Sequence, residues 1–391
     1  MRVLFTTWAW PSHLYPLVPL AWAMRAAGHD VLVASQPELL GEIIATGLPG
    51  VAVGADVDAV ELVRGYVLPS GGDQGGQAPR TGKGPRAMQM FLAHAEAMTG
   101  DLIDVCRSWR PDLIVYEPTA LAGPIAAAAV GVPAVRHLYG TDLMLRARAV
   151  LGDLLAPLAA RHGVTGVQPF GALTVDPTPP SLQVPVDDDR IAVRHLGFCG
   201  PGPARPSLPP RDGRRRVCVT WGHTMAKLDP GRFLAPLVVR ALAGEPDLEL
   251  VAAVSASQQP LLGAVPDGVT VLVDASLDEV FAGCELVVAH GGAATVLTAL
   301  RHGVPMLLIP QLPDHTGHAA RVLAVGAGEV LTRDQANAAT IVKETRRLLS
   351  DEAVRARARG LAEEMLRAPT PAQIVERLPA LSAGASTGRS Q

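Results

Sequence analysis

Hydrophobic residues in this chain form short continuous runs that alternate with stretches of helical spacing. In the first half, an apolar run at residues 3–7 precedes a helix-spaced set from Leu17 to Ala27, and this cycle repeats. The pattern predicts further strands at 30–34, 50–53, 112–116 and 133–138, with helices at 38–46 and 121–130. Continuous apolar strands between helices predict a parallel sheet that is covered on both faces.

The same alternation restarts after residue 210. The predicted strands are 217–220, 248–254, 269–273, 286–289 and 306–309, and the predicted helices are 233–243, 277–282, 293–301 and 318–325. The segment 341–366 is helical in pattern and strongly charged, and a short helix is expected within 369–378. Pro and Gly dominate residues 200–210, which predicts a linker, and Gly, Pro and Gln make 68–86 a predicted loop.

These patterns predict an α/β fold with two doubly wound Rossmann-like domains that face each other across a cleft. The expected boundaries are 1–200, a linker at 201–215, 216–367, and a C-terminal segment, 368–391, that returns to the first domain. In such sheets ligands bind beyond the carboxyl ends of the strands. The cleft between the domains is therefore the expected site.

Composition narrows the class of partner. The formal charge of −3 gives no net field to attract nucleic acid or an anionic membrane, so neither is expected as a partner. Four widely spaced cysteines suit buried thiols in a reducing compartment, and the N-terminus lacks the pattern of a signal peptide. A cytoplasmic enzyme of small molecules is expected, and a homodimer remains open.

The strongest chemical signal is an apolar strand that ends at His290 and is followed by Gly291 and Gly292. A helix is predicted to begin just after them, and its free N–H groups and positive end would suit an anion. His290 and Thr295 could add side-chain donors to phosphate oxygens. Alternatively, the glycines serve only a tight strand-to-helix turn.

A second polar cluster occurs in the segment 310–321. Asp314, His315 and His318 bring hydrogen-bonding groups to a predicted helix start, next to the His290 segment in the expected sheet. A sugar needs such convergent polar groups. The alternative for Asp314 is that it only caps the helix.

The loop after the first strand carries aromatic residues and a histidine. His13 is expected just before a helix start, where the helix dipole favours the neutral imidazole that a general base requires. Glu117, at the end of the predicted strand 112–116, could orient that imidazole as the carboxylate of a triad does. Alternatively, His13 caps the helix or packs against Tyr15, and Glu117 is a helix-start carboxylate.

Metal sites receive little support from the sequence. Residues 187–189 are three consecutive aspartates and Asp56 and Asp58 are also close, but both groups are interpreted as solvated loop acids. His315 and His318 could bind a metal only with a third ligand, which the sequence does not suggest. No metal is expected.

Together these segments resemble the inverting, nucleotide-sugar-dependent glycosyltransferases of the GT-B fold, especially those of bacterial antibiotic and polyketide pathways. The resemblance covers nearly the whole chain and includes His13 with Pro16, the segment 111–118, Trp221 with Gly222, residues 290–292 and the segment 310–321. It implies an acceptor-binding N-terminal domain and a donor-binding C-terminal domain. It also implies that His13 is the base and Glu117 its orienting carboxylate.

The resemblance further implies that a nucleotide-diphospho-sugar is the co-substrate and that no other cofactor is used. The residues that it places at the donor are Trp221, Gly222, His223, Val273, His290, Gly291, Gly292, Ala294, Thr295, Asp314 and His315. Trp8, Trp10 and Tyr15 would line the acceptor site. Ser12, His315 and His318 replace residues that are usual in the family, and a dTDP-deoxysugar, with fewer hydroxyl groups, suits these changes.

Three other functions fit the same sequence. A C-glycosyltransferase would use His13 to deprotonate a phenol and join the sugar to an aromatic carbon. A GT-B nucleotide-sugar epimerase would act on the donor alone and need no large acceptor site. A non-catalytic partner of another transferase would need neither the base nor the diphosphate loop.

Overall fold

The computed structural model describes residues 1–67, 83–200, 208, 210 and 213–378, and the chain divides into two compact units. The first unit contains Met1–Pro177, Val184–Arg194 and the tail from Ala368, and the second contains Thr178–Gln183 and His195–Arg367. Of the predicted loop at 68–86, residues 68–82 lie outside the described residues, as does most of the predicted linker, whereas residues 83–86 begin a helix and not a loop. Each unit is built around a parallel sheet of its own.

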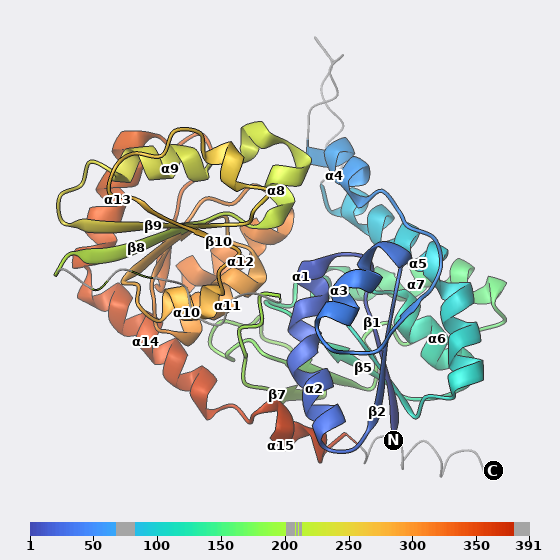
Figure 1. Cartoon of the computed structure of the whole chain (residues 1–391). Helices are drawn as coiled ribbons and strands as arrows, with labels where there is room; N and C mark the ends of the chain where they lie inside the picture. The colour runs from blue at the N-terminus through green and yellow to red at the C-terminus, as the bar shows by residue number, and fades with distance from the viewer. Residues whose placement is uncertain (68–82, 201–207, 209, 211–212, 379–391) are drawn as a thin grey trace. The chain divides into compact units, whose positions relative to one another are not determined.

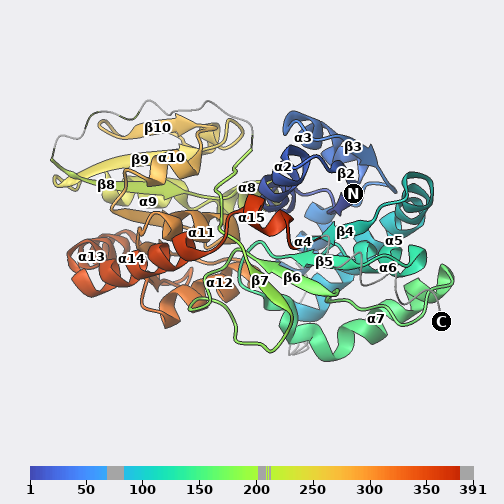
Figure 2. The same ribbon diagram turned by 90° about the horizontal axis from the view of Figure 1, so that it is seen from below.

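The first unit contains a seven-stranded parallel sheet with the order β3-β2-β1-β4-β5-β6-β7 (Figure 1). Its strands are β1 (Arg2–Thr6), β2 (Asp30–Ser35), β3 (Gly50–Ala52), β4 (Leu113–Tyr116), β5 (Ala134–His137), β6 (Leu173–Asp176) and β7 (Arg190–Ala192). Its helices are α1 (Pro11–Leu14), α2 (Val18–Ala26), α3 (Leu40–Ala45), α4 (Ala59–Val67), α5 (Lys83–Trp109), α6 (Ala122–Val130), α7 (Arg148–Arg161) and α15 (Pro371–Val375). Short 3₁₀ segments are η1 (Tyr15–Leu17), η2 (Pro37–Leu39) and η3 (Leu143–Ala147). Figure 2 shows α15 beside α2, against which it packs.

The second unit contains a six-stranded parallel sheet with the order β10-β9-β8-β11-β12-β13. Its strands are β8 (Arg215–Thr220), β9 (Leu248–Val254), β10 (Thr270–Val273), β11 (Leu286–Ala289), β12 (Met306–Leu308) and β13 (Gly328–Val330). Its helices are α8 (His223–Leu228), α9 (Ala235–Leu242), α10 (Leu277–Phe281), α11 (Ala293–Arg301), α12 (Pro313–Ala324), α13 (Ala338–Ser350) and α14 (Glu352–Arg367), with 3₁₀ turns η4 (Pro230–Arg232) and η5 (Gln259–Leu262). In Figure 1, α9 and α13 lie on one face of this sheet and α10 and α11 on the other.

Both sheets are wound in two directions from a central strand, and this order predicts where ligands bind. In the first unit the order reverses between β1 and β4, and in the second it reverses between β8 and β11. A crevice forms at such a switch point, beyond the carboxyl ends of the two strands. Thr6 pairs with Tyr116 there, and Thr220 pairs with Ala289. Glu117 and His290 are therefore the first residues after the strands at their respective switch points.

Burial explains why the strands read as continuous apolar runs. All four residues of β4 and all four of β11 are completely buried, because helices cover both faces of each sheet. The predicted fold class, with two doubly wound Rossmann-like domains, is confirmed. Within the part of the chain that the structure describes, no helix is long and apolar enough to cross a membrane.

Several elements differ from the sequence-based expectation. Helix α5 and the short strands β6, β7 and β13 were not predicted. Helix α12 begins at Pro313 rather than at residue 318, because Pro occupies the first helical position, where a missing N–H costs nothing. The charged segment 341–366 belongs to two helices, which are interrupted at Asp351. The predicted short helix within 369–378 is confirmed as α15.

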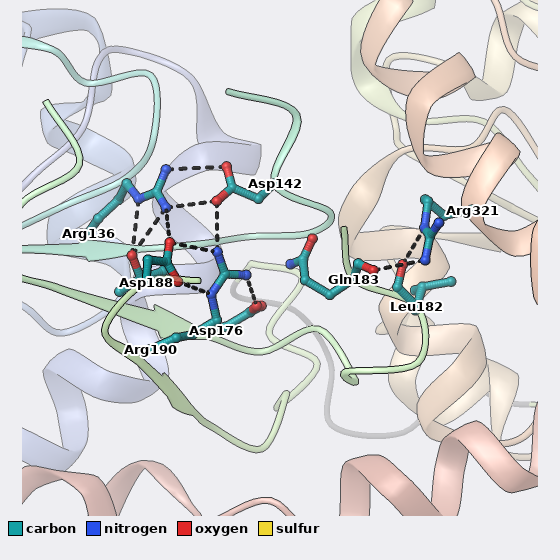
Figure 3. A network of polar contacts seen from close by, with 9 residues as sticks. Arg136, Asp142, Asp176, Leu182, Gln183, Asp188, Arg190 and Arg321 are labelled. Carbon is teal, nitrogen blue, oxygen red and sulfur yellow. Dashed lines mark hydrogen bonds and ion pairs between the residues drawn. The ribbon is translucent and has the colours of Figure 1, made fainter. Parts of the chain in front are cut away.

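The first unit contains a buried network of charged side chains at the carboxyl ends of β5 and β6, which Figure 3 shows. Asp142 Oδ2 lies 2.7 Å from Arg136 Nη2 and 3.1 Å from Arg190 Nη2, and the Asp142 side chain is wholly buried. Arg190 also pairs with Asp176 at 2.7 Å and with Asp188 at 3.0 Å. The network therefore connects β5, β6 and β7 to the loop that follows β5.

The burial and ion pairs of Asp188 contradict one prediction. Residues 187–189 were expected to be solvated loop acids, but the side chain of Asp188 is only 11% exposed and forms ion pairs with Arg190 and Arg136. The prediction is wrong for Asp188 alone, because Arg136 lies far away in sequence and joins the site only through the sheet, whereas Asp187 and Asp189 are exposed. Among the described residues, no three His, Cys, Asp or Glu side chains are grouped as a metal site would require.

The segment Thr178–Gln183 is attached to the second unit by hydrogen bonds. Arg321 on α12 donates from Nε to the carbonyl of Leu182 at 2.7 Å and from Nη2 to that of Gln183 at 2.8 Å (Figure 3). The backbone N–H of Ser181 donates to Glu364 on α14. These bonds explain why this short segment belongs to the unit formed by α12 and α14.

Candidate functional site

His13 and Glu117 form a partly buried pair at the switch point of the first unit. His13 Nδ1 lies 3.1 Å from Glu117 Oε2, and the side chains are 15% and 0% exposed. A carboxylate can only accept a hydrogen bond, so Nδ1 carries the proton and Nε2 keeps its lone pair. This is the tautomer that a histidine base needs.

His13 lies in a helix rather than before one. It is the third residue of α1, which the short segment η1 separates from α2. His13 therefore does not stand just before a helix, where a helix dipole was expected to favour its neutral form. The hydrogen bond to Glu117 holds the imidazole instead.

Thr119 and Trp8 complete the support of this pair, and the sequence analysis missed Thr119. Glu117 accepts hydrogen bonds from the Thr119 backbone N–H at 2.9 Å and from the Thr119 hydroxyl at 2.8 Å. The indole N–H of Trp8 donates to that hydroxyl oxygen, also at 2.8 Å. A Ser or Thr two residues after a strand-end carboxylate is a known local hydrogen-bonding pattern and could have served as the signal.

Aromatic rings enclose the His13 imidazole within the first unit. The ring centroids of Trp8 and Tyr139 each lie 4.7 Å from that of His13. A further ring, that of His94, has its centroid 4.4 Å from that of Trp8, and His94 Nδ1 lies 2.8 Å from Gln36 Oε1. Burial, and to a smaller degree the nearby His13, lowers the pKa of His94 to about 4, so this ring is neutral near pH 7.

The three residues assigned to the acceptor have different surroundings. Trp8 is 3% exposed and supports the His13–Glu117 pair. Trp10 is half-buried, with its ring centroid 5.6 Å from that of Trp8. Tyr15 is half-buried and donates its hydroxyl hydrogen to Glu42 at 3.0 Å. Their contact with an acceptor stays a prediction.

His290 occupies the switch point of the second unit. The backbone N–H of Gly222 donates to His290 Nδ1 at 3.1 Å. Because Nδ1 accepts, the neutral ring carries its proton on Nε2, and His290 is a hydrogen-bond donor at that atom. The ring itself is almost fully buried.

The glycines around His290 make room for its ring. A Cβ added at Gly222 would lie 2.5 Å from His290 Nε2, and one added at Gly292 would lie 2.4 Å from it. Gly291 has a φ of 90°, a conformation that favours glycine. The sequence left open whether the glycines after His290 serve only a tight turn, and in the structure the His290 ring itself requires glycine at Gly222 and Gly292.

Helix α11 begins directly after these glycines. Gly292 is its N-cap and provides no side chain to cap the first N–H groups of this nine-residue helix. Ala294 is half-buried and Thr295 is buried, both in the first turn. This helix start, together with the Nε2–H of His290, provides hydrogen-bond donors suited to an anion.

The segment 310–321 places two histidines in a buried position. Asp314 does not cap α12, because Leu312 is the N-cap and the Asp314 side chain is exposed in the first turn. The His315 ring packs edge-on against His290, with centroids 4.6 Å apart. Burial lowers the pKa of His315 and that of His318, the latter to about 4. Both rings are therefore neutral near pH 7.

The remaining predicted donor residues lie near strand ends. Trp221 directly follows β8 and is buried, and its indole N–H donates to Gln311 Oε1 at 3.2 Å. Val273 ends β10 and is half-buried. His223 begins α8, but its side chain lies outside the described ones.

The chain is similar in sequence and structure to known proteins over nearly its whole length. Family models for the N-terminal and C-terminal domains of erythromycin biosynthesis protein CIII-like proteins match residues 22–222 and 238–381. The chain is 35% identical to tylactone mycaminosyltransferase of Streptomyces fradiae, over 100% of this chain and 94% of that protein. It is 38% identical to L-demethylnoviosyl transferase of Streptomyces niveus, over 97% and 98%. It also resembles the crystal structure of glycosyltransferase VinC in complex with dTDP, with a TM-score of 0.81, 31% identity and coverage of 98% and 100%.

The fold, the switch-point residues and these similarities together define an antibiotic-type glycosyltransferase of the GT-B fold. More narrowly, the chain belongs to the family of erythromycin biosynthesis protein CIII-like proteins.

Proposed function

We propose that this glycosyltransferase moves a deoxysugar from a dTDP-activated donor to a hydroxyl group of a hydrophobic, polyketide-type acceptor, with inversion at the anomeric carbon. His13 Nε2 takes the proton of the acceptor hydroxyl, and the acceptor oxygen forms a bond to the anomeric carbon. The bond from that carbon to the diphosphate breaks, and its electron pair leaves with dTDP. The first unit supplies the base, and the second supplies the donor site.

The pairing of His13 with the fully buried Glu117 is the observation that supports this proposal most. Glu117 fixes the proton on Nδ1, so the other ring nitrogen is free to accept the hydroxyl proton. When the ring becomes positively charged, the adjacent buried carboxylate stabilises it. A non-catalytic partner would have no use for this arrangement.

The donor site is proposed to act without a metal ion. The Nε2–H of His290, the Thr295 side chain and the N–H groups at the start of α11 would bind the diphosphate and stabilise its charge as it leaves. The dTDP preference rests on the dTDP-bound VinC structure. The deoxysugar class is supported by a relative named aclacinomycin-T 2-deoxy-L-fucose transferase, from Streptomyces galilaeus.

The H13A variant tests the role of the base. Loss of a general base should lower kcat by roughly 10²- to 10⁴-fold and leave the affinity for dTDP unchanged, because the base acts on the acceptor proton. Transfer from a dTDP-deoxysugar to a macrolide aglycone, followed by mass spectrometry, gives the rate. Calorimetric titration with dTDP in EDTA gives the affinity.

The exposed neighbour Ser12 provides a matched control, and S12A should keep normal turnover. Full turnover in H13A would remove His13 from the mechanism. Loss of dTDP binding by the unmodified enzyme in EDTA would instead refute the metal-independent donor site.

A further inference from the structure

Gln258 is a buried polar residue that the proposed reaction does not use. It lies between β9 and η5 and is 3% exposed. A buried amide side chain is costly unless its hydrogen bonds are satisfied. The partners of Gln258 therefore indicate what holds it in this position.

The amide group of Gln258 connects two loops of the second unit. Its Oε1 accepts a hydrogen bond from the backbone N–H of Ser255 at 3.0 Å. Its Nε2 donates to the carbonyl of Trp221 at 2.6 Å and to that of Gly222 at 3.1 Å. Since Oε1 is bound to a donor, the amide has one orientation only, with its NH₂ group on the two carbonyls.

The two hydrogen bonds from Gln258 Nε2, called the Gln258 clamp below, hold the peptide group between Trp221 and Gly222. The N–H of that peptide belongs to Gly222 and donates to His290 Nδ1, so it determines which ring nitrogen of His290 carries the proton. If that peptide rotated, Nδ1 would lose its donor, and the neutral ring could carry its proton on Nδ1 instead. Close packing of His290 against Gly222 leaves little room for other adjustments.

We propose that Gln258 is a positioning residue of the donor site, which fixes the Trp221–Gly222 backbone so that His290 keeps the tautomer that donates from Nε2 to a diphosphate oxygen. The role of His290 toward the diphosphate rests on the proposed function. The effect of Gln258 on the His290 tautomer does not, because it is a property of the free protein.

Gln311 provides a matched comparison. It also contacts this loop, but it accepts from the Trp221 indole N–H and donates to the carbonyl of Arg232. It has no bond to the carbonyls of Trp221 or Gly222 among those described. Removing the Gln311 amide should disturb the packing of Trp221 and leave the hydrogen bonds from Gln258 to the Trp221 and Gly222 carbonyls in place.

The test combines nitrogen NMR of the His290 ring with calorimetric titration of dTDP, in Q258L, Q258E and Q311L. The signal of His290 is assigned by its absence in H290N. In the unmodified enzyme the neutral ring should be the Nε2–H tautomer. In Q258L and Q258E the Nδ1–H tautomer should appear, and dTDP should bind on the order of tenfold more weakly, the loss expected for one charge-assisted hydrogen bond.

Q258E keeps the size of the side chain and decides the question if Q258L does not fold. Q311L should retain the Nε2–H tautomer. An unchanged tautomer in the Gln258 variants, or an equal change in Q311L, would overturn the proposal. If the unmodified enzyme shows the Nε2–H tautomer but does not bind dTDP, the proposed function fails while the effect of Gln258 on the tautomer stands.

Discussion

At the level of single residues, the hydroxyl of Thr119 has a defined task. It has one hydrogen to donate, which goes to Glu117, and its oxygen accepts from the Trp8 indole. Every hydrogen-bonding group in this small network is therefore used. A side chain of similar shape without the hydroxyl would leave both Trp8 and Glu117 with an unsatisfied buried group.

The variant T119V is expected to lower kcat about tenfold, because Glu117 loses a hydrogen bond that fixes its orientation toward His13. The affinity for dTDP should not change, since Thr119 lies in the first unit. T119S keeps the hydroxyl and should retain most of the activity. Equal losses in T119V and T119S would mean that the methyl group, rather than the hydroxyl, matters here.

Sequence reasoning selected polar residues that the structure places at the two switch points, and it missed the residues that hold them in position. His13, Glu117 and His290 could be predicted because each follows an apolar strand at a position where ligands bind. Thr119 and Gln258 could not, because they bind a neighbouring carboxylate or backbone carbonyls, and such partners become visible only when the loops are folded.

At the level of elements, the parallel strands determine which residues meet. Glu117 lies beside the segment after β1 because Tyr116 pairs with Thr6, and His290 lies beside Gly222 because Ala289 pairs with Thr220. Apolar runs and helix-spaced segments predicted most of these strands. They did not predict β7 and β13. Each of these strands is only three residues long and contains a charged residue, Arg190 in β7 and Glu329 in β13, so neither forms a continuous apolar run.

The charged network between β5, β6 and β7 should contribute strongly to the stability of the first unit. In D142N, Arg136 and Arg190 would lose a shared buried carboxylate, and the free energy of unfolding should fall by about 3 kcal/mol. Hydrogen exchange of the β5 and β6 amides and urea denaturation would measure the loss.

Asp104 provides the control, because it pairs with Arg107 on the exposed surface of α5 and is itself 74% exposed. D104N should change the free energy of unfolding by less than about 1 kcal/mol. Similar losses in D142N and D104N would show that the buried network is not a major source of stability.

At the level of the whole molecule, each unit contains a fully buried neutral histidine. Burial lowers the pKa of His137 in the first unit and that of His318 in the second to about 4. The unfolded chain has an ordinary histidine pKa near ~6.5. Between these two values the unfolded state binds protons that the folded state does not.

The free energy of unfolding should therefore be highest above about pH 6.5 and should decrease as the pH falls toward 4. Each of the two residues can contribute up to about 3 kcal/mol to this decrease. Urea denaturation midpoints between pH 7 and pH 4.5 would measure it. In H318N the decrease should be smaller, and an unaltered pH dependence in both H318N and H137N would contradict this origin.

The tail of the chain has a practical consequence for hybrid enzymes made from two relatives. Helix α15 belongs to the first unit, where Pro371, Ile374 and Val375 are buried and the helix packs on α2. A single crossover after the first domain would place a foreign α15 against the native α2. A hybrid that exchanges only the donor half should therefore return to the original sequence at Ala368, so that the helix and its binding surface come from the same parent.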